Sequence, residues 1–251
     1  MKFTIITATY NSSSTLKDTL VSVNSQTYPD IEHIIVDGVS KDNSLEIVKM
    51  YGSRVTKVIS EPDNGIYDAM NKGIQAATGD IIGILNSDDF FTSPDVISII
   101  ADQFLKDPTL DGVYTNLYYV KQDDPKIIVR HWISNSFEER SFLKGWHPPH
   151  PTLYLRKEVY EKYGLFNLDF DLAADFELML RFFEKYKIKT KYIPETTIRM
   201  RLGGATSKSW KNIWRQNIQC INAFRKNGLN PSILYPVYRL LPKLFQYCNK
   251  R

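Results

Sequence analysis

Short apolar runs alternate with helical patterns over the first 110 residues of the chain. The apolar runs are β-branched on both faces, and they cover 3–7, 33–36, 55–59 and 80–85. The helical patterns between them are a Ser/Thr-capped segment at 14–26, a segment opened by a capping box at 43–46, and a segment at 66–77. Strands that are apolar on both faces and separated by single helices predict a mostly parallel sheet covered on both sides.

The second half of the chain continues this alternation in a less regular order. Strands are expected at 112–120, 126–132, 189–193 and 197–202, and helices at 156–163 and 173–185. Two amphipathic segments follow, at 209–227 and at 233–248, the second broken by prolines. The predicted architecture is therefore an α/β fold with a Rossmann-like, mostly parallel sheet and C-terminal amphipathic helices.

Polar clusters follow three of the expected strands at the point where each strand ends. They are 7–11 (Thr-Ala-Thr-Tyr-Asn), 37–38 (Asp-Gly) and 86–89 (Asn-Ser-Asp-Asp). Ligands of parallel sheets bind beyond the carboxyl ends of the strands. We therefore expect these three clusters to converge on one binding site.

The third cluster ends in two adjacent carboxylates, Asp88 and Asp89. Neighbouring carboxylates at the end of a buried strand repel each other, and a divalent cation relieves that repulsion. Their hard oxygen atoms suit Mg²⁺ or Mn²⁺. The alternative is a simple turn that leads into the helix opened by 93–95 (Ser-Pro-Asp).

Composition excludes several classes of protein. The chain has no run of 18 apolar residues, so no membrane-spanning helix is predicted, and the N-terminus does not resemble a signal peptide. The two cysteines, Cys220 and Cys248, show no metal-binding spacing, so a cytoplasmic protein is expected. Neither the GxGxxG pattern of dinucleotide-binding enzymes nor a P-loop is present.

Charge is distributed unevenly along the chain. The net charge is +4, yet the segment from Arg201 to Arg251 holds ten Lys and Arg and no Asp or Glu. A basic tail rich in aromatic residues favours an anionic surface, namely the cytoplasmic face of the inner membrane. The alternative is packing against the rest of the chain or against a second subunit in a homodimer. No nucleic-acid recognition motif accompanies the charge.

Four motifs in order resemble those of family 2 glycosyltransferases, which have the GT-A fold. They are 5–11 (Ile-Ile-Thr-Ala-Thr-Tyr-Asn), 35–44 (Ile-Val-Asp-Gly-Val-Ser-Lys-Asp-Asn-Ser), 61–73 (Glu-Pro-Asp-Asn-Gly-Ile-Tyr-Asp-Ala-Met-Asn-Lys-Gly) and 86–89, at the DXD position. The resemblance runs to about residue 205. It implies a catalytic domain at 1–205, whose donor half is 1–110 and acceptor half 111–205, before a basic tail at 206–251.

The resemblance implies a set of donor-binding residues. Asp37 would accept a hydrogen bond from uracil, although a role in a turn, or another base such as guanine or thymine, stays open. The residues expected against the nucleoside and its ribose are Thr7, Thr9, Tyr10, Asp63 and Gly65. One departure is Met70, where many relatives carry an arginine near the diphosphate.

A second departure lies at the DXD position, where Asn86 replaces the first aspartate. The resemblance implies that Asp88 binds the metal ion, with Asn86 and Ser87 near the ribose and the diphosphate. A neutral Asn86 should weaken metal binding without abolishing it. Asp89 either supports the loop or contacts the acceptor.

The resemblance places the catalytic base at Asp175, at the start of an expected helix. The alternative is an acidic residue that only stabilises the first turn of that helix, and Asp169 and Asp171 are the other candidates. His150, in the proline-rich loop 146–152, would contact the donor or the acceptor unless its ring is only bonded to the backbone.

Together these features predict an inverting, metal-dependent hexosyltransferase. It would use a nucleotide-sugar donor, a UDP-sugar by expectation, and a lipid-linked saccharide acceptor in surface polysaccharide biosynthesis. The alternatives are a sugar-1-phosphate nucleotidyltransferase, which needs a basic glycine-rich loop that 7–14 lacks, and a non-catalytic sugar-nucleotide-binding subunit.

Overall fold

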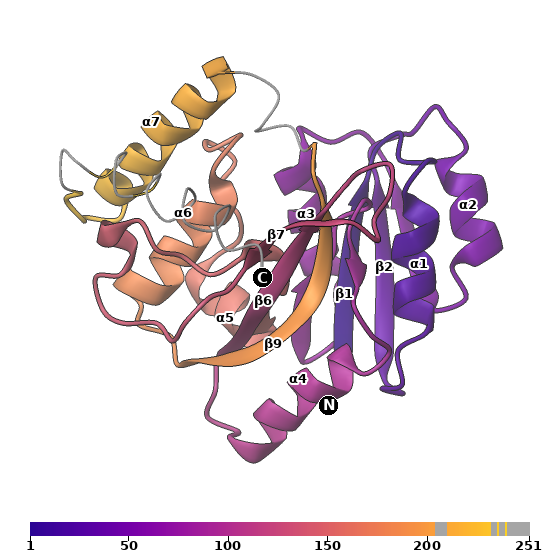
Figure 1. Cartoon of the computed structure of the whole chain (residues 1–251), viewed down its shortest axis with the longest axis horizontal. Helices are drawn as coiled ribbons and strands as arrows, with labels where there is room; N and C mark the ends of the chain where they lie inside the picture. Colours follow the sequence, from indigo (N-terminus) through magenta and orange to yellow (C-terminus); the bar gives the residue numbers. More distant parts are fainter. Residues whose placement is uncertain (204–209, 232–234, 236–238, 240–251) are drawn as a thin grey trace.

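One sheet organises the part of the chain that the computed structural model describes, residues 1–203, 210–231, 235 and 239 (Figure 1). Its strand order within these residues is β3-β2-β1-β4-β8-β6-β9-β5, and β7 pairs with β6. The strands are β1 (Phe3–Thr9), β2 (Ile31–Asp37), β3 (Val55–Ser60), β4 (Ile81–Ile84), β5 (Phe90–Phe91), β6 (Gly112–Val120), β7 (Ile128–Trp132), β8 (Tyr154–Arg156) and β9 (Thr190–Arg201).

The first four strands of this order are parallel, as the sequence predicts. The short strand β8 lies antiparallel between β4 and β6 and so joins the N-terminal half of the sheet to the C-terminal half. In the second half β6 and β9 are parallel. The strands expected at 189–193 and 197–202 are one strand, β9, because Pro194 is accommodated within its irregular pairing with β6.

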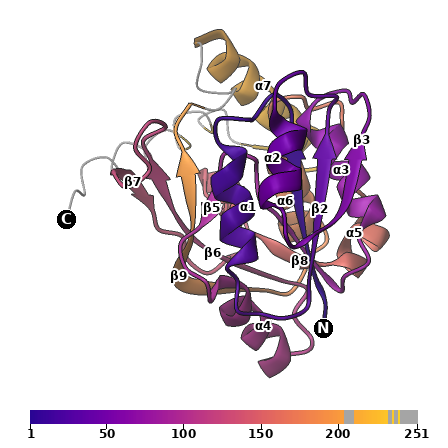
Figure 2. The same ribbon diagram turned by 90° about the vertical axis from the view of Figure 1, so that its right-hand side faces the viewer.

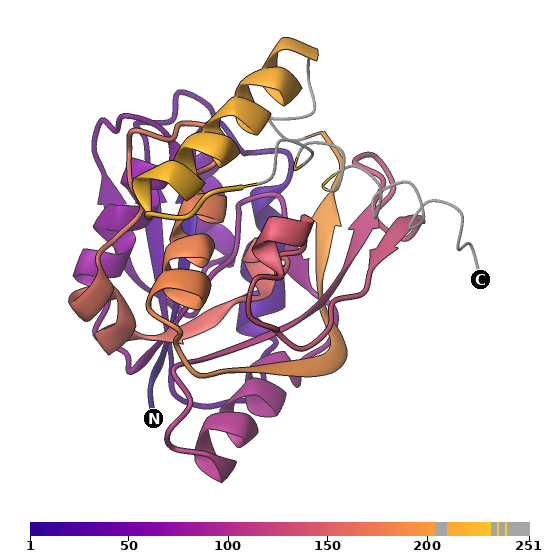
Figure 3. The ribbon, with the colours of Figure 1, turned by 90° about the vertical axis from the view of Figure 1, so that its left-hand side faces the viewer.

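Helices cover both faces of the sheet, which confirms the predicted fold class. They are α1 (Leu16–Asn24), α2 (Ser44–Tyr51), α3 (Ile66–Ala76), α4 (Val96–Lys106), α5 (Lys157–Tyr163), α6 (Ala174–Leu180) and α7 (Trp210–Lys226). Helices α1 and α2 lie in front of the sheet in Figure 2, and α6 and α7 lie in front of it in Figure 3. Side chains of β1 alternate between these layers, since Ile6 packs with α3 whereas Ile5 packs with α4.

The predicted helix caps form differently from expectation. Asn43 makes no capping hydrogen bond with its side chain, so the expected capping box is wrong. Asp42 instead accepts hydrogen bonds from the Ser44 N–H (3.0 Å) and the Ser44 hydroxyl (2.6 Å). At the start of α1, the Thr15 hydroxyl donates to the Ser87 carbonyl (2.9 Å) rather than capping its own helix. That bond ties α1 to the loop after β4.

The C-terminal helix α7 packs on α6, with Cys220, Ala223 and Phe224 in the shared core. Trp214 and Ile218, which belong to the predicted apolar face, are 69% and 44% exposed. Within the described residues no helix is long and apolar enough to cross a bilayer. Apart from Tyr235 and Arg239, the amphipathic segment expected at 233–248 lies outside the described residues.

Candidate functional site

A cavity of about 620 Å³ lies where the loops after β1 and β4 meet the start of α3. Most of the predicted donor-binding residues lie on its walls. They are Thr9, Tyr10, Asp63, Gly65, Asn86, Ser87 and Asp88. Of the three clusters expected to converge, parts of 7–11 and 86–89 line this cavity together with part of the 61–73 motif, whereas 37–38 does not line it.

Thr7 and Asp37, also predicted to bind the donor, are fully buried and do not line this cavity. The Thr7 hydroxyl lies 3.0 Å from Nε2 of His33, a ring whose pKa burial lowers to about 3. Asp37 accepts hydrogen bonds from the Ser40 N–H (3.1 Å) and the Ser60 hydroxyl (2.7 Å). Asp37 thus holds the loop after β2 in place beneath the cavity.

Gly38, Asp63 and Tyr10 meet at one end of the cavity. A β-carbon at Gly38 would collide with Oδ2 of Asp63 and lie 3.4 Å from the Tyr10 ring. Gly65 has φ +110°, a conformation that favours glycine, and its N–H donates to Oδ1 of Asp63 (2.9 Å). The absence of a side chain at Gly38 therefore leaves room for the Asp63 carboxylate, the Gly65 N–H holds it, and Tyr10 is 59% exposed beside it.

The loop after β4 places its two carboxylates in different surroundings. Asp88 lines the cavity, and partial burial raises its pKa. Asp89 is fully buried and accepts hydrogen bonds from Nδ2 of Asn86 (3.0 Å) and the Arg201 N–H (3.3 Å). Burial, and then the charge of Asp88, raise the pKa of Asp89 well above its usual value. Asp89 therefore supports the loop and does not face the cavity.

Arg201 holds this loop, a role that the sequence alone does not indicate. Its guanidinium donates to the Asp88 carbonyl (2.7 Å) and forms an ion pair with Asp18 on α1. The side chain is 5% exposed. The only signal in the sequence was a basic residue at the end of an expected strand, which does not reveal burial.

The residues around Asp88 fit a divalent cation. Oδ1 of Asn86 is buried and has no hydrogen-bond partner, and the Asp88 carboxylate lines the same cavity. Both are hard oxygen donors, and Mg²⁺ in particular combines one or two carboxylates with substrate phosphates and water. Within the described part of the chain no group of three His, Cys, Asp or Glu side chains could hold a metal ion alone. A cation here would therefore take further ligands from a bound diphosphate.

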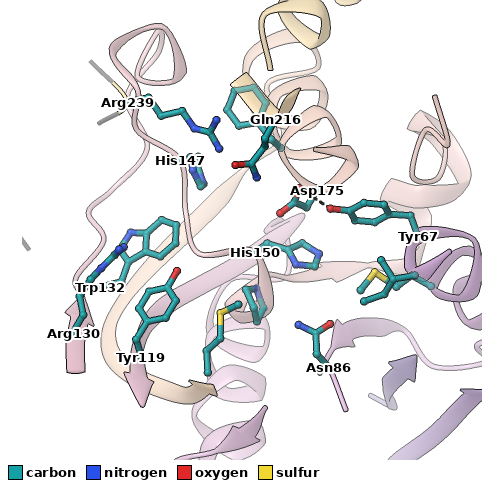
Figure 4. Close-up of a pocket in the computed structure, with 15 residues that line it drawn as sticks. Tyr67, Asn86, Tyr119, Arg130, Trp132, His147, His150, Asp175, Gln216 and Arg239 are labelled. Carbon is teal, nitrogen blue, oxygen red and sulfur yellow. Dashed lines mark hydrogen bonds between the residues drawn. The ribbon is translucent and has the colours of Figure 1, made fainter. Parts of the chain in front are cut away.

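A second cavity, of about 240 Å³, shares Ile66, Asn86 and Met200 with the first (Figure 4). Asp175 lies in its wall, in the first turn of α6. The Tyr67 hydroxyl donates a hydrogen bond of 3.0 Å to Oδ1 of Asp175. Burial, and then the charge of Asp175, raise the pKa of Tyr67 far above its usual value, so Tyr67 remains a donor.

His150 lines the second cavity with Asp175. Burial lowers the pKa of its imidazole more than the charge of Asp175 raises it, so the ring is neutral near pH 7. The other candidate bases, Asp169 and Asp171, lie elsewhere and form ion pairs with Lys226 and Arg215 of α7. Of the three candidate carboxylates, Asp175 is therefore the one that lines the second cavity.

The second cavity also contains residues that the sequence did not single out. They are Tyr119, Arg130, Trp132, Gln216 and Arg239, which are labelled in Figure 4 together with Tyr67 of the 61–73 motif and His147 of the proline-rich loop. Tyr119 and Trp132 lie in expected strands, but the pattern of a strand does not tell which of its faces borders a cavity. The positions of Gln216 and Arg239 depend on how the C-terminal helices pack, which no motif encodes.

Known proteins resemble this chain in sequence. A family model described as glycosyl transferase family 2 matches residues 4–164. An uncharacterized glycosyltransferase of Mycobacterium tuberculosis is 35% identical over 179 residues, which are 70% of this chain and 67% of that protein. A PGL/p-HBAD biosynthesis glycosyltransferase of Mycobacterium bovis is 27% identical over 76% of this chain and 73% of its own length. Chondroitin synthase of Pasteurella multocida is 30% identical over 72% of this chain but only 18% of its own length.

Solved structures resemble the fold. A mannosyltransferase from Pyrobaculum calidifontis in complex with GDP-Man and Mn²⁺ has a TM-score of 0.64 and 21% identity, over 97% of this chain and 69% of that one. Residues 1–349 of S. aureus TarS, in complex with UDP, have a TM-score of 0.61 and 17% identity, over 88% of this chain and 66% of that one. At these identities the likeness concerns the fold, which both proteins share with this chain.

Proposed function

The chain belongs to glycosyltransferase family 2 and has the GT-A fold, and we propose that it transfers a sugar from a UDP-sugar to a saccharide hydroxyl with inversion. The observation that carries this proposal is the junction of the two cavities. Asn86 lines both, Asp88 lies on the donor side and Asp175 on the acceptor side. A leaving group and an attacking hydroxyl could thus meet at one anomeric carbon.

The donor would occupy the larger cavity. Its nucleoside would lie against Tyr10 and Asp63, and its diphosphate against Ser87 and Asp88. UDP in the complex of TarS supports a uridine nucleotide, and GDP-Man in the complex of the mannosyltransferase keeps a guanosine nucleotide as the alternative. Asp37 could accept a hydrogen bond from the base only if its carboxylate turned toward the cavity, away from the Ser40 N–H and the Ser60 hydroxyl.

A divalent cation held by Asp88 and Asn86 would neutralise the charge that grows on the departing diphosphate. Mn²⁺ in the complex of the mannosyltransferase supports this role. We expect EDTA to stop turnover and added Mn²⁺ or Mg²⁺ to restore it, measured as nucleoside diphosphate release. Full activity in excess chelator would exclude the metal.

Asp175 would act as the general base. Its carboxylate would remove the proton of the acceptor hydroxyl, which attacks the anomeric carbon in a single displacement and inverts it. We expect Asp175→Asn to bind UDP normally and to lose transfer by a factor of about 10² to 10⁴. Asp171→Asn is the matched control, because Asp171 pairs with Arg215 outside the cavity. Unimpaired turnover of Asp175→Asn would overturn this assignment.

Two alternative functions give a different result in one assay. A sugar-1-phosphate nucleotidyltransferase would release diphosphate from a nucleoside triphosphate, and a non-catalytic binding subunit would release nothing. The proposed enzyme should slowly hydrolyse its donor to nucleoside diphosphate and free sugar when Mn²⁺ is present and no acceptor is added.

The acceptor is proposed to be lipid-linked, in the biosynthesis of a surface polysaccharide or glycolipid. Relatives named for PGL/p-HBAD biosynthesis and chondroitin synthesis support this class of product. Trp214 and Ile218 are exposed on α7, and the chain from Arg201 onward carries ten basic and no acidic residues. Such a helix would hold the enzyme at the cytoplasmic face of the inner membrane, beside a lipid-linked substrate.

A further inference from the structure

The cavity that contains Asp175 has a second end, formed by aromatic rings and arginines of β6, β7 and the C-terminal segment. In Figure 4, Arg130, Trp132 and Arg239 lie on the left, whereas Asn86 lies further to the right, with Asp175 above it beside Tyr67. The end near Asn86 belongs to the junction with the donor cavity. The end near the arginines has no role in the chemistry proposed above.

Arg130 is held on an aromatic surface. It is paired with Tyr119 across β6 and β7, and its guanidinium lies 4.5 Å from the Tyr119 ring centroid and 5.3 Å from that of Trp132. The two rings are stacked, with centroids 6.2 Å apart and planes 7° from parallel. Although it carries a charge, Arg130 is only 8% exposed. Its guanidinium is therefore held in a fixed position at the cavity wall.

Arg239 borders the same cavity and is 6% exposed. One N–H donates to Oδ1 of Asn217 (2.9 Å), while Nε is buried with no hydrogen-bond partner. No carboxylate among residues 1–203, 210–231, 235 and 239 forms a salt bridge with Arg239. Burying a guanidinium without a compensating anion costs free energy. An anionic ligand bound at this end of the cavity would offset that cost.

The charges around the cavity favour a phosphate over a carboxylate. In the described part of the chain its charged lining residues are Arg130, Arg239 and Asp175, and Asp175 is already bonded to Tyr67. A phosphate or diphosphate offers several charged oxygen atoms, so it suits the Arg239 guanidinium together with the second positive charge of Arg130 better than a single carboxylate does.

We propose that the acceptor is a saccharide that carries a phosphate or diphosphate group, held by Arg130 and Arg239. Its sugar ring would pack against Trp132 and present a hydroxyl to Asp175. This inference rests on the proposed glycosyl transfer and narrows its acceptor to an anionic class. The phosphate could belong to a lipid-linked diphosphate or to a soluble sugar phosphate, which share this chemistry.

The test is a binding measurement with the donor site already filled. With UDP and Mn²⁺ at saturation, glucose 1-phosphate, farnesyl diphosphate glucose, methyl glucoside and methyl glucuronide are each titrated calorimetrically. We expect both phosphorylated probes to bind at least about tenfold more tightly than methyl glucoside and methyl glucuronide. A further gain for the farnesyl probe would identify a lipid-linked acceptor, whereas equal binding of the two would identify a soluble one.

Substitutions of the two arginines test whether they bind the phosphate group of the probes. Arg130→Gln and Arg239→Gln should each weaken binding of the phosphorylated probes about tenfold and leave UDP binding unchanged. Arg130→Lys keeps the positive charge but not the planar guanidinium, so it should weaken binding of the phosphorylated probes less than Arg130→Gln does. The control is Arg199→Gln, since Arg199 lies over Tyr118 (5.8 Å) outside both cavities.

Three results would each overturn the inference. They are binding of methyl glucoside as tight as that of the phosphorylated probes, tighter binding of methyl glucuronide than of those probes, and unchanged binding of the phosphorylated probes in both glutamine variants. Failure of UDP to bind in the wild-type chain would instead count against the proposed function, so the two failures are distinguishable.

Discussion

At the scale of single residues, the arrangement around Asp175 shows what the motifs did and did not predict. The resemblance to a family predicted Asp175 as the catalytic base. It did not predict its hydrogen-bond partner Tyr67, which lies 108 residues earlier in the motif at 61–73. Similarly, Asp89 was an open question because its partner Arg201 lies 112 residues away. Motifs predict which residue types are present, whereas burial and hydrogen-bond partners depend on distant packing.

Tyr67→Phe tests whether Tyr67 positions Asp175. The substitution keeps the ring against Phe166 (5.5 Å between centroids) and removes the hydrogen bond to the carboxylate. We expect kcat to fall about tenfold, because the carboxylate loses one of the groups that orient it, while the donor KM stays unchanged. Steady-state kinetics with varied donor would measure both. An unchanged kcat would show that Asp175 is oriented without Tyr67.

At the scale of elements, the strand ends were predicted well and the connections between strands less so. The order of apolar runs predicted β1 to β4, since each buried strand is a local pattern. It did not predict that the three-residue β8 would join the two halves of the sheet, because a strand so short has no pattern of its own. The proposed acceptor end of the site, on β6 and β7, was not predicted, because the pairing of these strands decides which of their faces borders the cavity.

Glu32 on β2 links its own strand to β1 and to the segment between α3 and β4. It is 7% exposed and accepts hydrogen bonds from the Thr4 hydroxyl (2.6 Å) and the Thr78 N–H (2.8 Å). Burial alone would raise its pKa, but these bonds and those from the Thr78 hydroxyl and Lys2 outweigh burial and lower it to about 2. The ionised carboxylate thus stabilises the fold at pH values above the ordinary pKa of 4.5.

Because its folded pKa is depressed, the contribution of Glu32 is complete above about pH 5 and is lost as the pH falls toward 2. We expect Glu32→Gln to lower the free energy of unfolding at pH 7 by roughly 3 kcal/mol. The difference from wild type should shrink at pH 3. Urea titrations at both pH values measure it, with Glu46→Gln, at an exposed position of α2, as the control. An equal difference at both pH values would contradict ionic stabilisation.

At the scale of the whole molecule, α7 lies on the far side of the sheet from α1 and α2 (Figures 2 and 3), and its sequence combines apolar with basic residues. The predicted apolar face of this segment is divided: Phe224 and Ile221 pack inward with the core, whereas Trp214 and Ile218 remain exposed. The sequence predicted the amphipathic helix but not this division, because both groups of residues satisfy the same helical period.

Trp214→Ser and Ile218→Ser should weaken binding to vesicles that contain anionic lipid. Each substitution removes an apolar side chain that would enter the interface, and we expect the double variant to lose about tenfold or more in affinity. Sedimentation with anionic and with neutral vesicles measures the effect. Leu105→Ser, at a 64% exposed position of α4, is the matched control. Equal vesicle binding by the double variant would assign these side chains to a protein partner instead.

The two cavities share a wall made by Ile66, Asn86 and Met200, and in the proposed reaction this wall would set the order in which the substrates bind. A donor in the larger cavity would lay its sugar across these three side chains and so supply part of the surface that the acceptor meets. Before the donor binds, that surface is missing. We therefore expect compulsory-order kinetics, in which the nucleotide sugar binds first and the spent nucleotide leaves last.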